Sequence, residues 1–331
     1  MIALEDMLAD LPQPDREARV AMRARADAVL RPAGALARLD EIAVWLAGWQ
    51  GTSRPSVVHP WTLVFVADHG VASAEVSAYP TEVTKSMLAA LESGVATASA
   101  MSRSLGARFA AIDVGVGDPT GDIRIEPALT HDRAARCVDA GRAAVERAAD
   151  QGADLLVLGE MGIANTTVAA AVCATLFGGD AGDWAGRGTG VDDDALARQV
   201  DAIEAARSRA DGLEPLDVLR EAGGAELVAI AAAVMQARRR SIGVVLDGFV
   251  VGASVAPLHV AAPGSLDHCL AGHRSAEPGH SLLLERLQLD PIVDLGLRLG
   301  EASGALVALP IIRLAAAAVS DVATFEEWGL A

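Results

Sequence analysis

The sequence has few cysteines, few aromatic residues and too few positive charges to balance its acids. Its 331 residues include three cysteines, Cys137, Cys173 and Cys269, which are spaced too widely for a CxxC metal pair or a disulfide framework. This usage favours a reduced, cytoplasmic setting. Aromatic residues make up only 3% of a chain that is 52% hydrophobic, so the interior must be built mainly from Ala, Val, Leu and Ile. Such an interior suits parallel strands covered by helices on both faces.

The charge balance excludes two classes of partner. A formal net charge of −17 argues against nucleic acid and against an anionic membrane, because both require a basic surface. An anionic ligand must therefore be held by backbone dipoles or by a few basic side chains. The first eleven residues contain three acids, Glu5, Asp6 and Asp10, where a signal peptide would have basic residues. We therefore expect no signal peptide in this segment. The apolar run 305–319 is interrupted by Pro310 and Arg313, so we expect no membrane span.

Short apolar segments alternate with helical patterns through the middle of the chain. Four segments have the character of buried strands: 62–68, 107–115, 153–160 and 242–249. The alternation predicts an α/β fold with a Rossmann-like, doubly wound parallel sheet, in which ligands bind beyond the carboxyl ends of the strands. We expect this large domain to span residues 56–269. Residues 1–55 and 270–331 read as helical and predict a smaller all-helical domain formed by both termini.

The segment GEMGIANTT, residues 159–167, follows one of the predicted strands and precedes an Ala-rich helix. Backbone N–H groups at a helix start favour a phosphate, so Gly162, Ile163 and Ala164 are candidate anion ligands. Glu160 would repel that phosphate unless it faces another part of the substrate. The alternative is an ordinary βα turn in which Asn and Thr cap the helix.

A second glycine-bearing loop, GRGTG at 186–190, offers Gly188 and Thr189 as another part of an anion cradle. The run Asp192–Asp194 that follows is typical of an acidic first helical turn. A metal-bound diphosphate site is the alternative, but no second acidic cluster completes it.

Other motifs are weaker. DVGVGDPTG, at 113–121, has the wrong glycine spacing for a dinucleotide loop, so a nicotinamide-dependent oxidoreductase remains a poorly supported alternative. VVLDGF, at 244–249, is similar to the ribose-diphosphate loop of common phosphoribosyltransferases but has one acid, Asp247, where that motif has two. His268, His273 and His280 are spaced too irregularly to predict a metal site.

Glu301 is the strongest candidate for a general base. It lies in LRLGEASGALVALP, residues 297–310, among small residues at the start of an apolar helix. In a cleft lined by apolar groups its carboxylate would be partly desolvated, which raises its pKa toward the range of a working base. The simpler interpretation is an acid in a first helical turn.

Several of these motifs occur in one order from about residue 62 to 310: ADHGV, SAYPTEVT, GEMGIANTT, GRGTG, REAGGAEL, VVLDGFVV, GHRSAEPGH and LRLGEASGALVALP. Together they resemble the family of nicotinate-nucleotide–dimethylbenzimidazole phosphoribosyltransferases. The resemblance implies transfer of ribose 5-phosphate from nicotinate mononucleotide to 5,6-dimethylbenzimidazole, giving α-ribazole 5′-phosphate and nicotinate. It also implies a homodimer that uses neither a metal nor another cofactor.

The resemblance assigns roles to individual residues. Glu301 would be the general base, and Glu160 would face the reacting base and sugar. The phosphate would lie on the two glycine-bearing loops with help from Ser275. The base-binding slot would be lined by Tyr79, Pro80, Met87, Met161 and Leu299.

One position departs from the family pattern. A lysine is expected on the helix after GRGTG, but Gln199 stands there beside Arg198, and we place both at the nucleotide. This departure keeps one alternative open, a protein that binds benzimidazole or its nucleotide without turnover.

Overall fold

A six-stranded parallel β-sheet runs through the computed structural model, which describes residues 2–186, 188 and 190–330. The strand order is β2-β1-β3-β4-β5-β6, and every neighbouring pair is parallel. The chain reverses its direction of winding between β1 and β3, the kind of switch point at which ligands bind. The predicted doubly wound sheet is confirmed. The strands are β1 (Pro60–Ala67), β2 (Arg108–Gly115), β3 (Leu155–Met161), β4 (Gly243–Leu246), β5 (Cys269–Arg274) and β6 (Pro291–Asp294).

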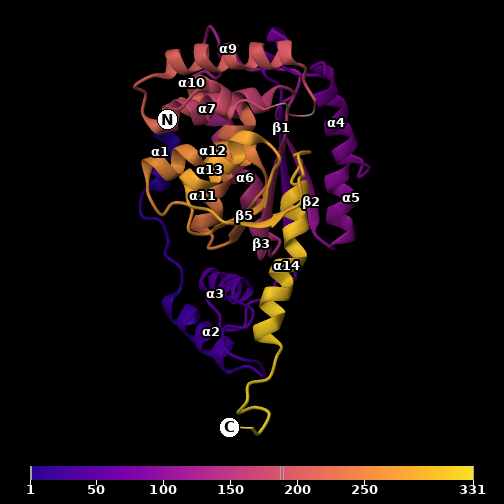
Figure 1. Cartoon of the computed structure of the whole chain (residues 1–331), viewed down its shortest axis with the longest axis vertical. Coiled ribbons are helices and arrows are strands. Elements are labelled where there is room, and N and C mark those ends of the chain that lie inside the picture. Colours follow the sequence, from indigo (N-terminus) through magenta and orange to yellow (C-terminus); the bar gives the residue numbers. More distant parts are fainter. Residues whose placement is uncertain (1, 187, 189, 331) are drawn as a thin grey trace.

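Helices connect the strands and cover both faces of the sheet (Figure 1). In chain order they are α1 (Ile2–Leu8), α2 (Arg16–Ala28), α3 (Arg38–Gln50), the 3-10 helix η1 (Gly70–Ala74), α4 (Glu82–Glu92), α5 (Thr97–Ser104), α6 (His131–Asp150), α7 (Asn165–Phe177), α8 (Ala181–Trp184), α9 (Asp193–Ala210), α10 (Pro215–Ala222), α11 (Ala225–Arg239), α12 (Phe249–Ala261), α13 (Pro278–Leu287) and α14 (Ser303–Ser320).

The strands send alternate side chains into two separate cores. Leu63 and Phe65 of β1 join one core, with α6, α7, α11 and α12. Val64 and Val66 join the other, with α3, α5 and α14. This period of two follows from the pleat of a strand, and burial on both faces explains why β1 is apolar throughout.

The helical prediction for residues 270–331 is wrong in two places, because β5 and β6 extend the sheet there. The segment CLAGHR of β5 contains no β-branched residue, so local propensity does not reveal the strand. Packing selects it instead. An added Cβ at Gly272 would lie 2.6 Å from Ala305 Cα, so only glycine lets β5 and α14 approach this closely.

Parts of the two terminal segments pack together, whereas α1, which was predicted to belong with them, packs against α6 and α11 of the large core. Helices α2 and α3 lie beyond one end of the sheet beside the second half of α14 (Figure 1), and Met22, Val44 and Val319 share a small core. Among the described residues, α14 passes a length and composition test for a membrane span, but 61% of that stretch is buried. It packs against α3 and β5, as the core helix of a globular protein does.

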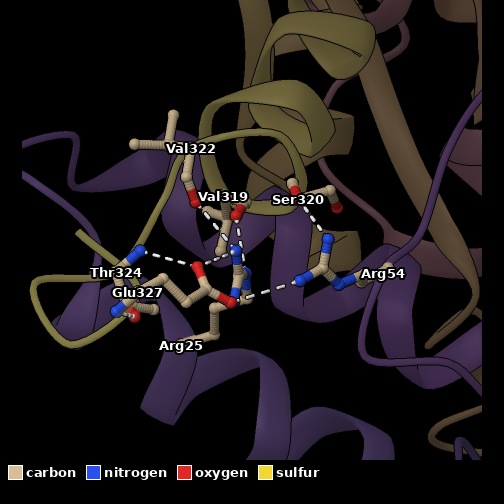
Figure 2. A network of polar contacts seen from close by, with 7 residues as sticks. All are labelled: Arg25, Arg54, Val319, Ser320, Val322, Thr324 and Glu327. Carbon is tan, nitrogen blue, oxygen red and sulfur yellow. Dashed lines mark hydrogen bonds and ion pairs between the residues drawn. The ribbon is translucent and has the colours of Figure 1, made fainter. Parts of the chain in front are cut away.

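Ion pairs and hydrogen bonds connect the turn around Glu327, after α14, to α2 and to the segment that follows α3. Figure 2 shows Glu327 between Arg25 and Arg54, at N–O distances of 3.0 and 3.4 Å. Arg25 also donates to the carbonyl oxygens of Val319 and Val322. These contacts join the end of the chain to α2 and to the segment after α3.

Candidate active site

A cavity of about 360 Å³ opens beyond the carboxyl ends of β3, β4, β5 and β6. This is the edge of the sheet at which the sequence predicted a ligand site. The lining residues come from the GEMGIANTT motif, from the LRLGEASG motif, from the α4 region, from Gly188, from the segment after β4 and from the loop after β5. They are Ser77, Tyr79, Val83, Met87, Glu160, Met161, Gly162, Ile163, Ala164, Asn165, Thr166, Gly188, Gly248, Phe249, Val250, His273, Ser275, Glu277, Arg298, Leu299, Gly300 and Glu301.

The motifs GEMGIANTT and LRLGEASG meet directly at the cavity. The amide of Glu301 donates to the carbonyl oxygen of Glu160 at 3.0 Å. An added Cβ at Gly159 would lie 2.1 Å from the backbone nitrogen of Ala302, so a larger residue at 159 would push the motifs apart. The first glycine of GEMG thus permits the two predicted acids, which come from distant parts of the sequence, to line one cavity.

Glu160 is almost fully buried, with 8% of its surface exposed. Burial, reinforced by the charges of Glu226 and Asp247, raises its pKa from 4.5 to about 8, although a hydrogen bond from Asn165 Nδ2 acts in the opposite direction. At neutral pH this carboxyl group is therefore mostly protonated. A neutral acid does not repel a phosphate, so a buried Glu160 is electrostatically compatible with an anion in this cavity at neutral pH.

Glu301 lies in a strained turn at the start of α14. Gly300, Glu301 and Ala302 all have positive φ, at 85°, 60° and 69°, a region that non-glycine residues rarely adopt. The side chain of Glu301 is 3% exposed, and one of its oxygens lies 3.5 Å from the amide nitrogen of Ala98 at the start of α5. Burial raises the pKa of this carboxyl group, and the nearby charge of Asp247 raises it further.

The loop before α7 is only partly arranged as predicted. Gly162, Ile163 and Ala164 all line the cavity, but the amide of Ile163 donates to Thr84 Oγ1 at 3.3 Å. Ala164 has φ 75°, so the alanine adopts a conformation that glycine would adopt more readily.

Part of the second glycine-bearing loop also reaches the cavity. Gly188 lines it, while the predicted ligand Thr189 lies outside the described residues. The carboxylate of Glu277 accepts a hydrogen bond from the backbone of Gly188, and burial raises the pKa of this carboxyl group. An added Cβ at Gly186 would lie 2.0 Å from Glu277 Oε2, so a larger residue there would displace the Glu277 carboxyl group. Asp192, after this loop, accepts from the amide of Ala195 and caps α9, which confirms the predicted acidic first turn.

Polar groups from the loop after β5 complete this side of the cavity. Ser275 lines it, and its amide donates to Nδ1 of His280 at 2.9 Å. Burial lowers the pKa of His280 to about 3, so its ring stays neutral and can accept that bond. The hydroxyl oxygen of Ser275 is buried and has no hydrogen-bond partner among the residues that the structure describes.

The apolar lining agrees with most of the predicted base-binding residues. Tyr79, Met87, Met161 and Leu299 line the cavity, and Val83 of α4 joins them. Tyr79 and Leu299 are about half exposed, at 49% and 48%, so they lie at its rim. Pro80 is exposed and is not among the lining residues, so its contact with the base stays a prediction.

Arg198 and Gln199, the predicted nucleotide ligands on α9, both contact the segment before α4. Arg198 donates to the carbonyl oxygen of Glu75 at 2.9 and 3.1 Å, and neither residue lines the cavity. Gln199 is buried and donates to the carbonyl oxygen of Val76 at 2.8 Å. The orientation of α9 directs these side chains toward the segment before α4. Their role here is to hold that segment in place.

Several lining residues were missed by sequence reasoning. Asn165 was assigned only to helix capping, whereas its amide donates to Glu160. Arg298 is the cationic residue among the described lining residues, and it donates to the carbonyl oxygen of Gly188. Its place beside Leu299 in the LRLGE motif was the available signal. Glu277 and His273 lie in the motif GHRSAEPGH, which was the available signal for both, although only Ser275 of that motif was assigned to the site.

Of the weaker motifs, VVLDGF contributes Gly248 and Phe249 to the cavity and His273 also lines it, while the others lie elsewhere. Asp113 of DVGVGD accepts from the amides of Gly115 and Val116 in its own turn, and that loop does not line the cavity. His268 is buried against the carbonyl oxygen of Val234. His69 is paired with Glu226 at 2.7 Å, with both side chains inaccessible to solvent.

The fold and cavity define an α/β protein with a small-molecule site at the carboxyl edge of a doubly wound sheet, and the paired carboxyl groups suit an enzyme. A family model described as phosphoribosyltransferase matches residues 11–330. The chain is 46% identical over 323 residues to a nicotinate-nucleotide–dimethylbenzimidazole phosphoribosyltransferase of Cereibacter sphaeroides, covering 97% of this chain and 94% of that protein. It is 45% identical over 333 residues to the protein of that name from Novosphingobium aromaticivorans, covering 100% and 97%.

A solved structure supports the same family assignment. The crystal structure of CobT from Thermus thermophilus superposes with a TM-score of 0.91 at 40% identity, covering 95% of this chain and 99% of the other. The chain therefore belongs to the family of nicotinate-nucleotide–dimethylbenzimidazole phosphoribosyltransferases, and it is a pentosyltransferase.

Proposed function

We propose that this chain transfers the ribose 5-phosphate group of nicotinate mononucleotide to 5,6-dimethylbenzimidazole, with Glu301 as the general base. The observation that carries the proposal is the placement of Glu301 and Glu160 on one cavity that also has an apolar lining. Nucleophile activation requires a carboxylate within reach of the acceptor N–H, and the buried position of Glu301 raises its pKa toward that task.

In the proposed reaction one nitrogen of the benzimidazole attacks C1′ of the donor while Glu301 accepts the proton from the other nitrogen. The bond between C1′ and the nicotinate nitrogen breaks, and its electron pair neutralises the positively charged ring. Attack from the face opposite the leaving group inverts C1′, so a β-nucleotide becomes α-ribazole 5′-phosphate. General-base catalysis of this kind supplies about 10²–10⁴-fold in rate.

The apolar side of the cavity suits the acceptor. Val83 and Met87 of α4 and Met161 at the end of β3 offer a flat, uncharged surface for an aromatic ring. A slot of this type discriminates single methyl groups by about 1–3 kcal/mol, so related bases would also be accepted.

The polar side suits the phosphate of the donor. Gly188, Ser275 and Arg298 line the cavity, and the Ser275 hydroxyl, which has no partner within the described part of the chain, can donate to a phosphate oxygen. We place the phosphate here, with Thr189 as a further candidate ligand. Protonation of Glu160, which has a pKa of about 8, limits repulsion of the phosphate at neutral pH.

Assembly and location are part of the proposal. We infer a homodimer, supported by the edge strand β2, whose apolar residues Phe109 and Ile112 are only half buried. Light scattering should then give twice the 34.0-kDa chain mass, and a value of one chain mass would reject the dimer. The free, buried cysteines Cys137, Cys173 and Cys269 support a reduced, cytoplasmic location.

The experiment is an incubation of the protein with nicotinate mononucleotide and dimethylbenzimidazole, followed by chromatography. We expect free nicotinate and a new nucleotide in equal amounts, with the α configuration at C1′ by nuclear Overhauser contacts. Omission of either substrate is the control. Tight binding of the base by calorimetry without any turnover would reject the enzyme and select a binding protein.

A further inference from the structure

Asp247 follows strand β4 and contacts the turn that carries Glu301, although it is not among the residues that line the cavity. Its side chain is 1% exposed. Oδ2 accepts from the amide of Ala302 at 3.1 Å, and Oδ1 accepts from the amide of Ala305 at 2.9 Å. Both carboxylate oxygens are thus used by the first turn of α14.

The first turn of α14 needs such a partner. Helix starts leave backbone N–H groups without intrahelical acceptors, and a side chain at the N-cap position normally satisfies one of them. Here the N-cap residue is Ala302, which has no side-chain acceptor. The carboxylate of Asp247, 55 positions before Ala302 in the chain, performs this capping instead by accepting from the amide of Ala305.

The same contact stabilises an unfavourable backbone. Three consecutive residues, Gly300, Glu301 and Ala302, have φ between 60° and 85°. For a non-glycine residue a left-handed conformation costs about 1–2 kcal/mol, so Glu301 and Ala302 require an external constraint. The bond to the amide of Ala302 acts at the end of this turn, and the amide of Glu301 is held by Glu160 O at 3.0 Å.

We propose that Asp247 is a positioning residue for the transfer reaction, one that holds the Gly300–Ala302 turn so that the carboxyl group of Glu301 faces the acceptor base. This inference rests on the proposed function, because it assigns Asp247 a task only if Glu301 is the base.

Asp247 also sets the electrostatics of the turn. Burial is the main cause of the raised pKa values of Glu301 and Glu160. The negative charge of Asp247 raises both pKa values further. The charged and titratable groups around it are Glu160 from β3, Glu301 before α14 and His273 from β5, whose Nε2 lies 3.4 Å from Asp247 Oδ1. Removing the charge of Asp247 should lower the pKa of both glutamates.

The test is Asp247→Asn in the full-length protein. Asparagine can accept from only one of the two amides, because its NH₂ group faces the other donor. We expect kcat to fall on the order of 10²-fold, as a displacement of about 1 Å at the base can cause, with the Kd for nicotinate mononucleotide within about threefold of wild type. The pH profile of kcat/KM should move to lower pH. An unchanged kcat and profile would overturn the proposal.

A matched control and a double-mutant cycle separate positioning from folding. Asp15→Ala removes a side-chain cap elsewhere, since Asp15 accepts from the amide of Ala18 at the start of α2, and it should leave kcat unchanged. Ala302→Gly removes the backbone cost at position 302 while that of Glu301 remains, so Asp247→Asn should lower kcat less in the glycine background. Equal loss in both backgrounds would contradict the proposal.

Two further variants keep the outcome interpretable. If Asp247→Asn does not fold, Asp247→Ser retains a single acceptor oxygen and is measured in the same cycle, with the same expected loss. Glu301→Gln is measured in parallel. Full activity of Glu301→Gln would reject the proposed function itself. Loss of activity in Glu301→Gln, with full activity in folded Asp247 variants, would reject only the positioning role.

Discussion

Replacing Glu160 with glutamine is expected to change how the stability of the fold depends on pH. Burial raises the pKa of Glu160 from 4.5 to about 8 in the folded protein. Between these two values the folded state holds one more proton than the unfolded state. The free energy of unfolding must therefore fall as pH rises, by about 1.4 kcal/mol per pH unit for this one group.

The magnitude follows from the two pKa values. The contribution of this protonation to stability is complete below pH 4.5, where both states are protonated. It declines as pH rises and is lost as pH passes through about 8, where the folded state also releases its proton. Between pH 6 and pH 9 the wild type should lose about 2.5 kcal/mol relative to Glu160→Gln, which has no proton to lose. The glutamine can still accept the hydrogen bond from Asn165 Nδ2, so its packing changes little.

The assay is urea denaturation of both proteins at half-unit steps from pH 6 to pH 9. Subtracting one stability curve from the other cancels groups that do not interact with Glu160. Glu285→Gln, at an exposed position on α13, controls for the loss of one surface charge and should give a flat difference. A flat difference for Glu160→Gln as well would refute the view that this carboxyl group is buried and protonated at neutral pH.

Three further predictions concern single side chains. Arg298→Ala should raise the KM for nicotinate mononucleotide about tenfold, with less effect at high salt, because Arg298 is the cationic group among the described lining residues; an unchanged KM in steady-state kinetics would remove Arg298 from the phosphate site. Leu306→Ala, at a position with no exposed surface in the core between α14 and the sheet, should lower the free energy of unfolding by about 2–5 kcal/mol without changing the denaturant slope; a loss under about 1 kcal/mol would contradict that packing. The hydrogen bond from Arg25 lowers the pKa of Glu327 to about 2, so its stabilising contact is complete above pH 4.5 and is lost as pH falls toward 2; a carboxyl titration by NMR, assigned with Glu327→Gln, should show this low midpoint, and a midpoint near 4.5 would contradict it.

Strong local patterns predicted most of the sheet. The segments around β1 and β3 are apolar and are followed by loops of small residues. The sequence therefore predicted both that they are strands and that ligands bind at their carboxyl ends. Glu160 and Glu301 could be selected because each interrupts a run of small or apolar residues. Their convergence, however, depends on Gly159, whose missing side chain matters only once Ala302 lies against it.

Long-range packing determined what local patterns did not reveal. Strand β5 forms from CLAGHR because its neighbours pair with it and α14 covers it, although its composition is not strand-like. The side chains of Arg198 and Gln199 point to the Glu75–Val76 segment because of how α9 is oriented. Asp247 looked like half of a diphosphate motif, and its amide partners lie 55 and 58 positions away.

The most direct test of the central claim compares Glu301→Gln with wild type in two measurements on the same preparation. The first is the rate of nicotinate release with both substrates, and the second is the Kd for nicotinate mononucleotide by calorimetry. Loss of the general base should lower the rate by about 10²–10⁴-fold while the donor Kd stays within about threefold. Turnover within a few fold of wild type, or equal loss of turnover and donor binding, would contradict the assignment of Glu301 as the base.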